Sequence, residues 1–203
     1  MAEQVKWILA SGSPRRRELL ARIQPVFKVI KPDVDEWEPD EADPIHQTEE
    51  NAARKGRAVS RNQPDALVIA ADTTVCLGGR IFGKPADLEA AFHMLKSLSG
   101  REHTVVTGMA LFYKGREKIF NDVSRVLFRE LDDEAIREYT DRVHVLDKAG
   151  AYGIQEQGEL IIDHYDGSFE NIMGLPIQRL RQVLVELDWV DMPDLNKTEC
   201  QKT

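Results

Sequence analysis

The stretch Ala66-Leu67-Val68-Ile69-Ala70-Ala71 is the most strand-like run of this chain, and the charged residue Asp72 follows it directly. A short, continuous apolar run of this kind is typical of a strand that is buried on both faces. We predict that this strand ends at Asp72. A second strand over 74–77 should then lead into a tight hairpin turn at Gly78-Gly79, because paired glycines suit a two-residue loop.

Strands and helices alternate on both sides of this stretch. Towards the N-terminus, residues 5–10 predict a short buried strand, and a helix follows it until Pro25. Towards the C-terminus, two long strands over 103–113 and 118–128 are joined at Lys114-Gly115, which makes them antiparallel neighbours. This pattern predicts an α/β protein with a mixed sheet. The remaining predicted elements are helices over 45–60, 87–97, 131–140 and 176–187, strands over 26–30 and 160–165, and an acidic loop over 33–43.

The composition limits the classes of partner. The chain has 203 residues, of which 42% are hydrophobic and 31% charged. We therefore expect one globular domain over 1–188 and a polar, flexible tail over 189–203. The net charge of −8 argues against broad binding to a nucleic acid polymer or to an anionic membrane. It still allows an anionic small molecule in a local basic pocket.

The cellular setting follows from what the sequence lacks. The N-terminus has no long apolar core of a signal peptide, and no apolar run reaches the roughly 20 residues that a membrane-spanning helix needs. Cys76 and Cys200 are too few for a disulfide framework and do not have the spacing of a zinc site. We therefore expect a cytoplasmic protein.

The segment Ser11-Gly12-Ser13-Pro14-Arg15-Arg16-Arg17 is the first candidate site, because it lies between a predicted strand and a predicted helix. Backbone amides at the start of a helix attract anions, and a glycine lets a phosphate approach closely. Three arginines in a first helical turn oppose the helix dipole, so a bound anion would offset that cost. The alternative is a solvated basic helix start that binds nothing.

Asp72 is the second candidate. Carboxylates at the carboxyl ends of strands in α/β sheets often face the ligand crevice. Asp72 could bind Mg²⁺ or take a proton from an attacking water, and Thr73 offers a hydroxyl beside it. The alternative is an aspartate that forms a turn by capping local amides.

Two further segments are weaker candidates. Residues 78–84 have the G-x-x-x-x-G-K spacing of a phosphate-binding loop, but Pro85 stands where such a loop needs Ser or Thr, so we reject that interpretation. Lys84 could still contact a phosphate, or it could be a surface lysine in a turn. In residues 147–155, Gln155 could hydrogen-bond the edge of a base, although a structured loop is the simpler interpretation.

Other polar residues give no sign of a site when taken alone. The five histidines form no metal-binding spacing and no hydrolase triad, and no G-x-S-x-G motif is present. Lys55 lies on the polar helix over 45–60, where an exposed charged face is the default expectation.

Several short motifs gain meaning from their joint order and spacing. They are L-A-S-G-S-P-R-R (9–16), V-D-E (34–36), Lys55, A-D-T (71–73), G-K-P (83–85), L-S-G-R-E-H (98–103), D-K-A-G-A-Y-G-I-Q (147–155) and G-L-P (174–176). With these motifs the chain resembles the Maf family of nucleotide pyrophosphatases, also called septum formation inhibitors. The resemblance runs from about Ile8 to about Leu187.

The resemblance implies an elongated α/β fold with a mixed, twisted sheet, flanking helices and a deep cleft between two lobes, akin to inosine triphosphatases. It also implies hydrolysis of a nucleoside triphosphate to the monophosphate and pyrophosphate, with a divalent cation, Mg²⁺ or Mn²⁺, as cofactor. Asp72 would be the catalytic proton acceptor, and Asp72 and Glu36 would be the metal ligands. The substrate-binding residues would be Ser11, Ser13, Arg15, Arg16, Glu36, Lys55 and Lys84.

The family has bacterial subgroups with different substrates. One prefers dTTP and UTP, whereas another accepts 7-methyl-GTP, CTP and UTP and has Trp, Gln and Glu at three discriminating positions. Here Arg15, Thr73 and Gln155 match the first subgroup, so the resemblance implies a dTTP/UTP pyrophosphatase. One departure is Gly56, where Ala is common; Gly costs about 0.5–1 kcal/mol in a helix interior.

A hypothesis from another class is a non-catalytic nucleotide-binding regulator of septum formation. The presence of Asp72, Lys55, Lys84 and Gln155 argues against an inactive site. Within the family, the biological task would be the removal of non-standard nucleotides or the restraint of cell division. The expected partner is a nucleoside triphosphate, and a homodimer stays open.

Overall fold

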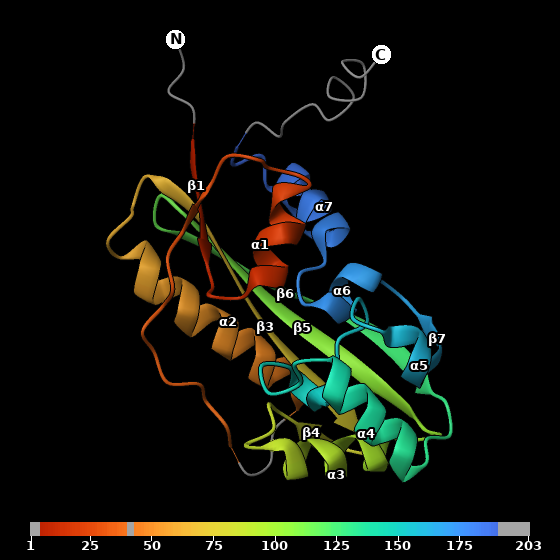
Figure 1. Cartoon of the computed structure of the whole chain (residues 1–203). Coiled ribbons are helices and arrows are strands. Elements are labelled where there is room, and N and C mark those ends of the chain that lie inside the picture. Colours follow the sequence, from red (N-terminus) through yellow and green to blue (C-terminus); the bar gives the residue numbers. More distant parts are fainter. Residues whose placement is uncertain (1–4, 40–42, 191–203) are drawn as a thin grey trace, which may run out of the picture.

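A mixed β-sheet runs the length of the molecule (Figure 1). The computed structural model describes residues 5–39 and 43–190, and within them the sheet has seven strands. Their order is β2-β1-β3-β5-β6-β7, and β4 also pairs with β3. The strands are β1 (Lys6–Ala10), β2 (Lys28–Val29), β3 (Ala66–Leu77), β4 (Arg80–Phe82), β5 (Glu102–Tyr113), β6 (Arg116–Phe128) and β7 (Ile162–Asp166).

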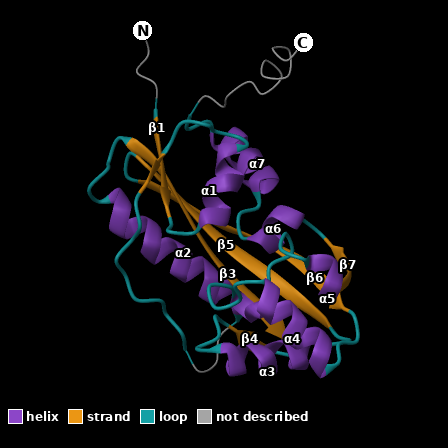
Figure 2. Ribbon diagram, in the orientation of Figure 1, coloured by secondary structure: helices purple, strands orange, loops and turns teal. Residues whose placement is uncertain are grey.

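Helices cover both faces of this sheet (Figure 2). On β3, Ala66, Val68 and Ala70 pack with the long helix α2, whereas the alternate residues Leu67 and Ile69 face the larger core formed with the other helices. This alternation is what the period of two along a strand requires. The helices are α1 (Pro14–Ala21), α2 (Pro44–Ser60), α3 (Leu88–Leu98), α4 (Asp133–Arg142), α5 (Gly158–Ile161), α6 (Phe169–Met173) and α7 (Ile177–Leu187), with a short 3₁₀ turn, η1 (Ala149–Ala151).

Strand β3 does not end at Asp72, as the sequence predicted, but continues through it to Leu77. The change from apolar to polar residues marks a change of surroundings and not the end of the strand. Strand β1 pairs with residues 66–70 of β3, and β4 pairs with residues 75–77. Within the described residues, 71–74 therefore lack a strand partner on that edge. This gap in the sheet places Asp72 beside open space.

Two glycines let α2 approach the sheet closely. A Cβ on Gly108, which lies opposite Asp72 on β5, would come within 2.3 Å of the backbone carbon of Thr48. A Cβ on Gly56 would come within 2.2 Å of the Phe112 ring. Gly56, a departure from the family pattern, is therefore explained by packing against this aromatic side chain.

Both predicted hairpins are present. The turns at Gly78-Gly79 and Lys114-Gly115 have positive φ at both positions, as the favoured two-residue hairpin loop requires. Residues 80–82 form β4 and α3 begins only at Leu88, so no helix starts at Gly83-Lys84 and the rejection of a phosphate-binding loop there is confirmed.

Other predicted boundaries are partly wrong. Only 28–29 of the predicted strand over 26–30 pair with β1, and the first residues of the strand over 160–165 belong to α5. The short helix α6 was not predicted. The predicted tail lies mostly outside the described residues, although Val190 is described and is buried. Within the described ranges, no helix is long and apolar enough to cross a bilayer.

Candidate active site

A cleft of about 1330 Å³ opens at the gap in the sheet. One wall is the loop between β1 and α1, another is the face of α2, and the segment over 147–155 closes a third side. The structure brings the predicted site residues together, since all of them line this cleft: Ser11, Ser13, Arg15, Arg16, Glu36, Lys55, Asp72, Thr73, Lys84 and Gln155.

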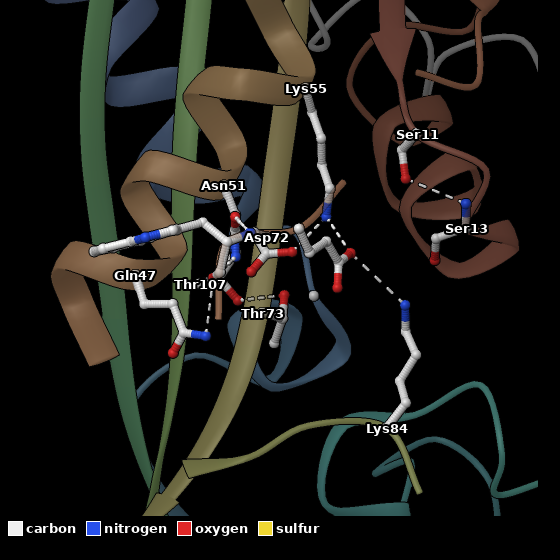
Figure 3. A network of polar contacts seen from close by, with 12 residues as sticks. Ser11, Ser13, Gln47, Asn51, Lys55, Asp72, Thr73, Lys84 and Thr107 are labelled. Atoms are coloured by element: carbon white, nitrogen blue, oxygen red, sulfur yellow. Dashed lines mark hydrogen bonds and ion pairs between the residues drawn. The ribbon is translucent and has the colours of Figure 1, made fainter. Parts of the chain in front are cut away.

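Lys55 joins two carboxylates at the centre of the cleft (Figure 3). Its Nζ lies 2.6 Å from Asp72 Oδ1 and 2.6 Å from Glu36 Oε1. The expectation of an exposed Lys55 is wrong, because α2 turns this side chain inward over the sheet, where it is buried. Burial alone would raise the pKa of Glu36, but the hydrogen bond and charge of Lys55, with smaller effects of Lys84 and Arg16, lower it overall.

The two carboxylates fit a divalent cation in part. In the part of the chain that the structure describes, no group of three or more His, Cys, Asp or Glu side chains forms a metal cage. Mg²⁺, however, is commonly held by one or two carboxylates together with substrate phosphates. Asp72 and Glu36 supply that number of carboxylates. The exposed Lys84 has its Nζ 3.9 Å from Glu36 Oε1. The donor set therefore suits a cation that arrives with a nucleotide.

The loop between β1 and α1 is built around the hydroxyl of Ser11. Ser11 Oγ accepts hydrogen bonds from the amide of Ser13, at 3.2 Å, and from Arg16 Nη1, at 3.4 Å. Ser13 caps α1, and Pro14 occupies the first turn of that helix. The loop thus directs two hydroxyls and a helix N-terminus to the cleft, which is the arrangement expected of an anion site.

Arg16 has neutral partners only. Its guanidinium donates to the carbonyl of Gly174 at 2.9 Å and to Thr73 Oγ1 at 3.0 Å, and within the described residues no carboxylate lies within ion-pair distance of it. Burial lowers the pKa of Arg16, and the charge of Asp72 acts in the opposite direction. A partly buried cation without a carboxylate partner favours a bound anion.

Thr73 lies on the face of β3 opposite to Asp72 and belongs to a chain of hydroxyls. Thr107 Oγ1 donates to the carbonyl of Asn171 at 3.0 Å, so at its 3.0 Å contact with Thr73 it acts as the acceptor. Thr73 in turn accepts from Arg16. The sequence did not point to Thr107, because its partners come from a distant strand and from α6.

A second ionic network crosses the cleft to the predicted base-reading residue. Arg15 donates to the side chain of Asp147 at 2.7 Å, and Asp147 accepts from the buried Lys148 at 2.9 Å. Lys148 also lies 3.1 Å from Glu156, which accepts from Gln155 Nε2 at 2.7 Å. Sequence motifs contained Asp147 and Lys148 but gave them no role. The network links Arg15, in the first turn of α1, to Gln155.

Comparison with known proteins identifies the family of this chain. Residues 6–187 match the family described as Maf-like protein. The chain belongs to the Maf family.

Its Maf relatives are similar over nearly their whole length. A protein of Carboxydothermus hydrogenoformans named "dTTP/UTP pyrophosphatase" is 44% identical over 90% of this chain and 98% of its own. A protein of Thermococcus kodakarensis with the same name is 46% identical, over 84% and 91% of the two chains. Among solved structures, the Staphylococcus aureus Ham1 protein covers 89% of this chain and 98% of its own, with a TM-score of 0.53 and 20% identity. That likeness concerns the fold alone and agrees with the predicted α/β class.

The ionic network of this Maf chain makes its stability depend on pH. Burial opposes ionisation of Asp147, but hydrogen bonds and charges from Lys148 and Arg15 outweigh it and lower the pKa of Asp147. A carboxyl with a lowered pKa stabilises the folded state above its unfolded-state pKa of about 3.9, and this contribution disappears as the pH falls through the folded-state pKa. Asp147→Asn should therefore destabilise the protein at pH 7 by no more than about 1 kcal/mol, because the carboxylate is partly exposed.

Urea denaturation at pH 7 and pH 3 measures this difference. The difference between the two proteins should be largest at pH 7 and smaller at pH 3. An equal difference at both pH values would mean that the ionised carboxylate is not what stabilises this part of the fold.

Proposed function

We propose that this protein hydrolyses dTTP and UTP to the nucleoside monophosphate and pyrophosphate. The observation that carries this proposal is the pair of carboxylates bridged by Lys55, which faces a loop built to hold an anion. The proposal also rests on relatives named dTTP/UTP pyrophosphatase that are 44% and 46% identical to this chain. An enzyme of this kind is a hydrolase acting on acid anhydrides.

In the proposed reaction the triphosphate lies against the loop of Ser11 and Ser13, and Arg16 and Lys84 share its negative charge. Asp72 has one oxygen on Lys55, and in the described structure its second oxygen has no protein hydrogen-bond partner. That oxygen can hold a water and accept its proton. The water oxygen bonds to the α-phosphorus as the bond to the bridging oxygen breaks, and pyrophosphate leaves with that electron pair.

A divalent cation, Mg²⁺ or Mn²⁺, would be held by Asp72 and Glu36 together with the phosphates. When bound, it supplies positive charge that stabilises the negative charge of the leaving group. Lys55 holds both carboxylates side by side, whether Asp72 serves as the base or as a ligand.

Gln155 is proposed to read the base. Glu156 binds the amide nitrogen of Gln155, and Gln155 Oε1 is buried without a partner in the described structure. The free group of this amide is thus an acceptor, which matches the imide N–H of thymine and uracil and not the unprotonated ring nitrogen of cytosine. Arg15 and Thr73, the other two discriminating positions, act through the networks described above.

Replacing Gln155 tests this role. Gln155→Glu should lower dTTP and UTP turnover by about tenfold or more, because the carboxylate faces Glu156 and loses the donor that orients it. Steady-state kinetics with dTTP, UTP and CTP measure the change. The double variant Gln155→Glu/Glu156→Gln restores a hydrogen bond between the two positions and again presents an oriented acceptor, so it should recover dTTP and UTP turnover. Wild-type turnover and selectivity in Gln155→Glu would exclude base reading by Gln155.

Pyrophosphate release from purified nucleoside and deoxynucleoside triphosphates tests the proposed function directly. Release from dTTP and UTP, dependent on Mg²⁺ or Mn²⁺, is the expected result. Nucleotide binding without release would favour the alternative, a non-catalytic regulator of septum formation.

The wider setting is also a proposal. A nucleotide, and not a nucleic acid polymer or a membrane, is the partner that the charge of −8 and the cleft beside Asp72 favour. We place the enzyme in the cytoplasm, where it would remove non-standard nucleotides or restrain cell division. A homodimer would be visible by light scattering.

A further inference from the structure

The backbone of Trp37 is held by side chains of α2. The amide of Trp37 donates to Asn51 Oδ1 at 2.7 Å, and Asn51 Nδ2 donates back to the carbonyl of Trp37 at 3.1 Å. Gln47 Nε2 donates to the same carbonyl at 3.2 Å. Asn51 is 3% exposed, so both of its hydrogen bonds are shielded from water.

These bonds replace those that a neighbouring strand would provide. Residues 31–39 form no helix or strand, yet they carry Glu36 into the cleft. A buried backbone amide and carbonyl both need partners. Asn51 satisfies both groups of Trp37, and it therefore fixes the rotation of the peptide next to Glu36.

Asn51 and Lys55 lie four residues apart on α2, so they share one face of the helix. Figure 3 shows Gln47, Asn51 and Lys55 arranged in this order along α2, with Asp72 beside them. One helix face thus holds the backbone of the segment through Asn51 and the side chain of Glu36 through Lys55.

We propose that Asn51 is a positioning residue that aims the carboxylate of Glu36 at Lys55, next to Asp72. This proposal rests on the proposed function. The Trp37 ring also contacts α2, with its centroid 5.3 Å from that of His46 and 5.9 Å from the guanidinium carbon of Arg54. Those contacts keep the segment near the helix without Asn51, but they do not set the direction of the Glu36 side chain.

A double-mutant cycle tests the functional step. Asn51→Ala should lower kcat for dTTP by about tenfold or more, since small displacements of a catalytic group have effects of this size. In a Glu36→Gln background the same substitution should change kcat by less than about threefold, because the carboxylate that Asn51 positions is already absent. Equal effects in the two backgrounds would overturn the proposal.

Hydrogen exchange tests the positioning role of Asn51 without measuring turnover. The Trp37 amide should be protected in the wild type, exposed in Asn51→Ala and protected again in Asn51→Asp, which keeps the acceptor oxygen. An amide that exchanges equally fast in all three proteins would overturn the proposal.

Val59→Ala serves as the control for stability, because Val59 lies buried on α2 and away from the cleft. This substitution should lower the melting temperature and leave kcat for dTTP close to the wild-type value. A wild type that releases no pyrophosphate would refute the proposed function. An active wild type in which the effects of Asn51→Ala and Glu36→Gln on kcat are additive would refute only the role of Asn51.

Discussion

Asp72→Asn should lower kcat for dTTP and UTP by about 10²–10⁴-fold, the range typical of losing a general base. Asparagine has nearly the same shape and can still accept a hydrogen bond from Lys55 through its oxygen. It cannot take a proton from water, and it removes one of the two negative charges beside Lys55. Pyrophosphate release measures the loss, and circular dichroism should show an unchanged fold.

The matched control makes the same chemical change outside the cleft. Asp163 lies on β7 with about half of its side chain exposed, and its recorded partner is the neighbouring His164. Asp163→Asn should keep wild-type turnover. Wild-type turnover in Asp72→Asn would remove Asp72 from the catalytic step.

Gly108→Ala should destabilise the protein by about 3 kcal/mol or more, at the upper end of what overpacking costs. The added methyl would meet the backbone of α2 at Thr48 and Glu49, at 2.3 and 2.4 Å, and backbone atoms cannot rotate away as a side chain can. We expect α2 to move off the sheet and carry Lys55 away from Asp72, so turnover should fall as well.

Urea denaturation of Gly108→Ala and Gly83→Ala measures this effect. A Cβ on Gly83 would meet nothing within 4 Å, so Gly83→Ala should change the free energy of unfolding by less than about 1 kcal/mol. Equal stability of the two variants would mean that the close contact between α2 and β5 is not required.

The sequence predicted the hairpins and most helices correctly, because these depend on local patterns. Two glycines or Lys114-Gly115 between apolar runs allow few other conformations. The end of β3 was predicted wrongly for a non-local reason. Polar residues such as Asp72 and Thr73 look like the end of a strand unless one knows that Lys55 and Arg16, both distant in sequence, provide their partners.

The segment from Ser11 to Arg17 and Asp72 were candidates from the sequence itself, whereas Glu36 and Lys55 were assigned to the site only through the resemblance to a family. Taken alone, Lys55 looked like one more charge on a polar helix, because nothing in its neighbourhood shows which face of α2 is buried. Asn51 and Thr107 were missed for the same reason, since their partners are backbone groups of remote segments. Sequence patterns show whether a segment forms a helix or a strand better than they show which residues of other segments it contacts.

The alternation of side chains along β3 has a consequence for how such an enzyme can evolve. Asp72 and Thr73 are adjacent in sequence but belong to opposite layers, Asp72 with Lys55 on α2 and Thr73 with Arg16 and Thr107 on the other side. Substitutions at Thr73 can therefore accumulate during evolution without touching the contact between Asp72 and Lys55. The strand keeps the two sets of contacts apart although their residues are neighbours in the sequence.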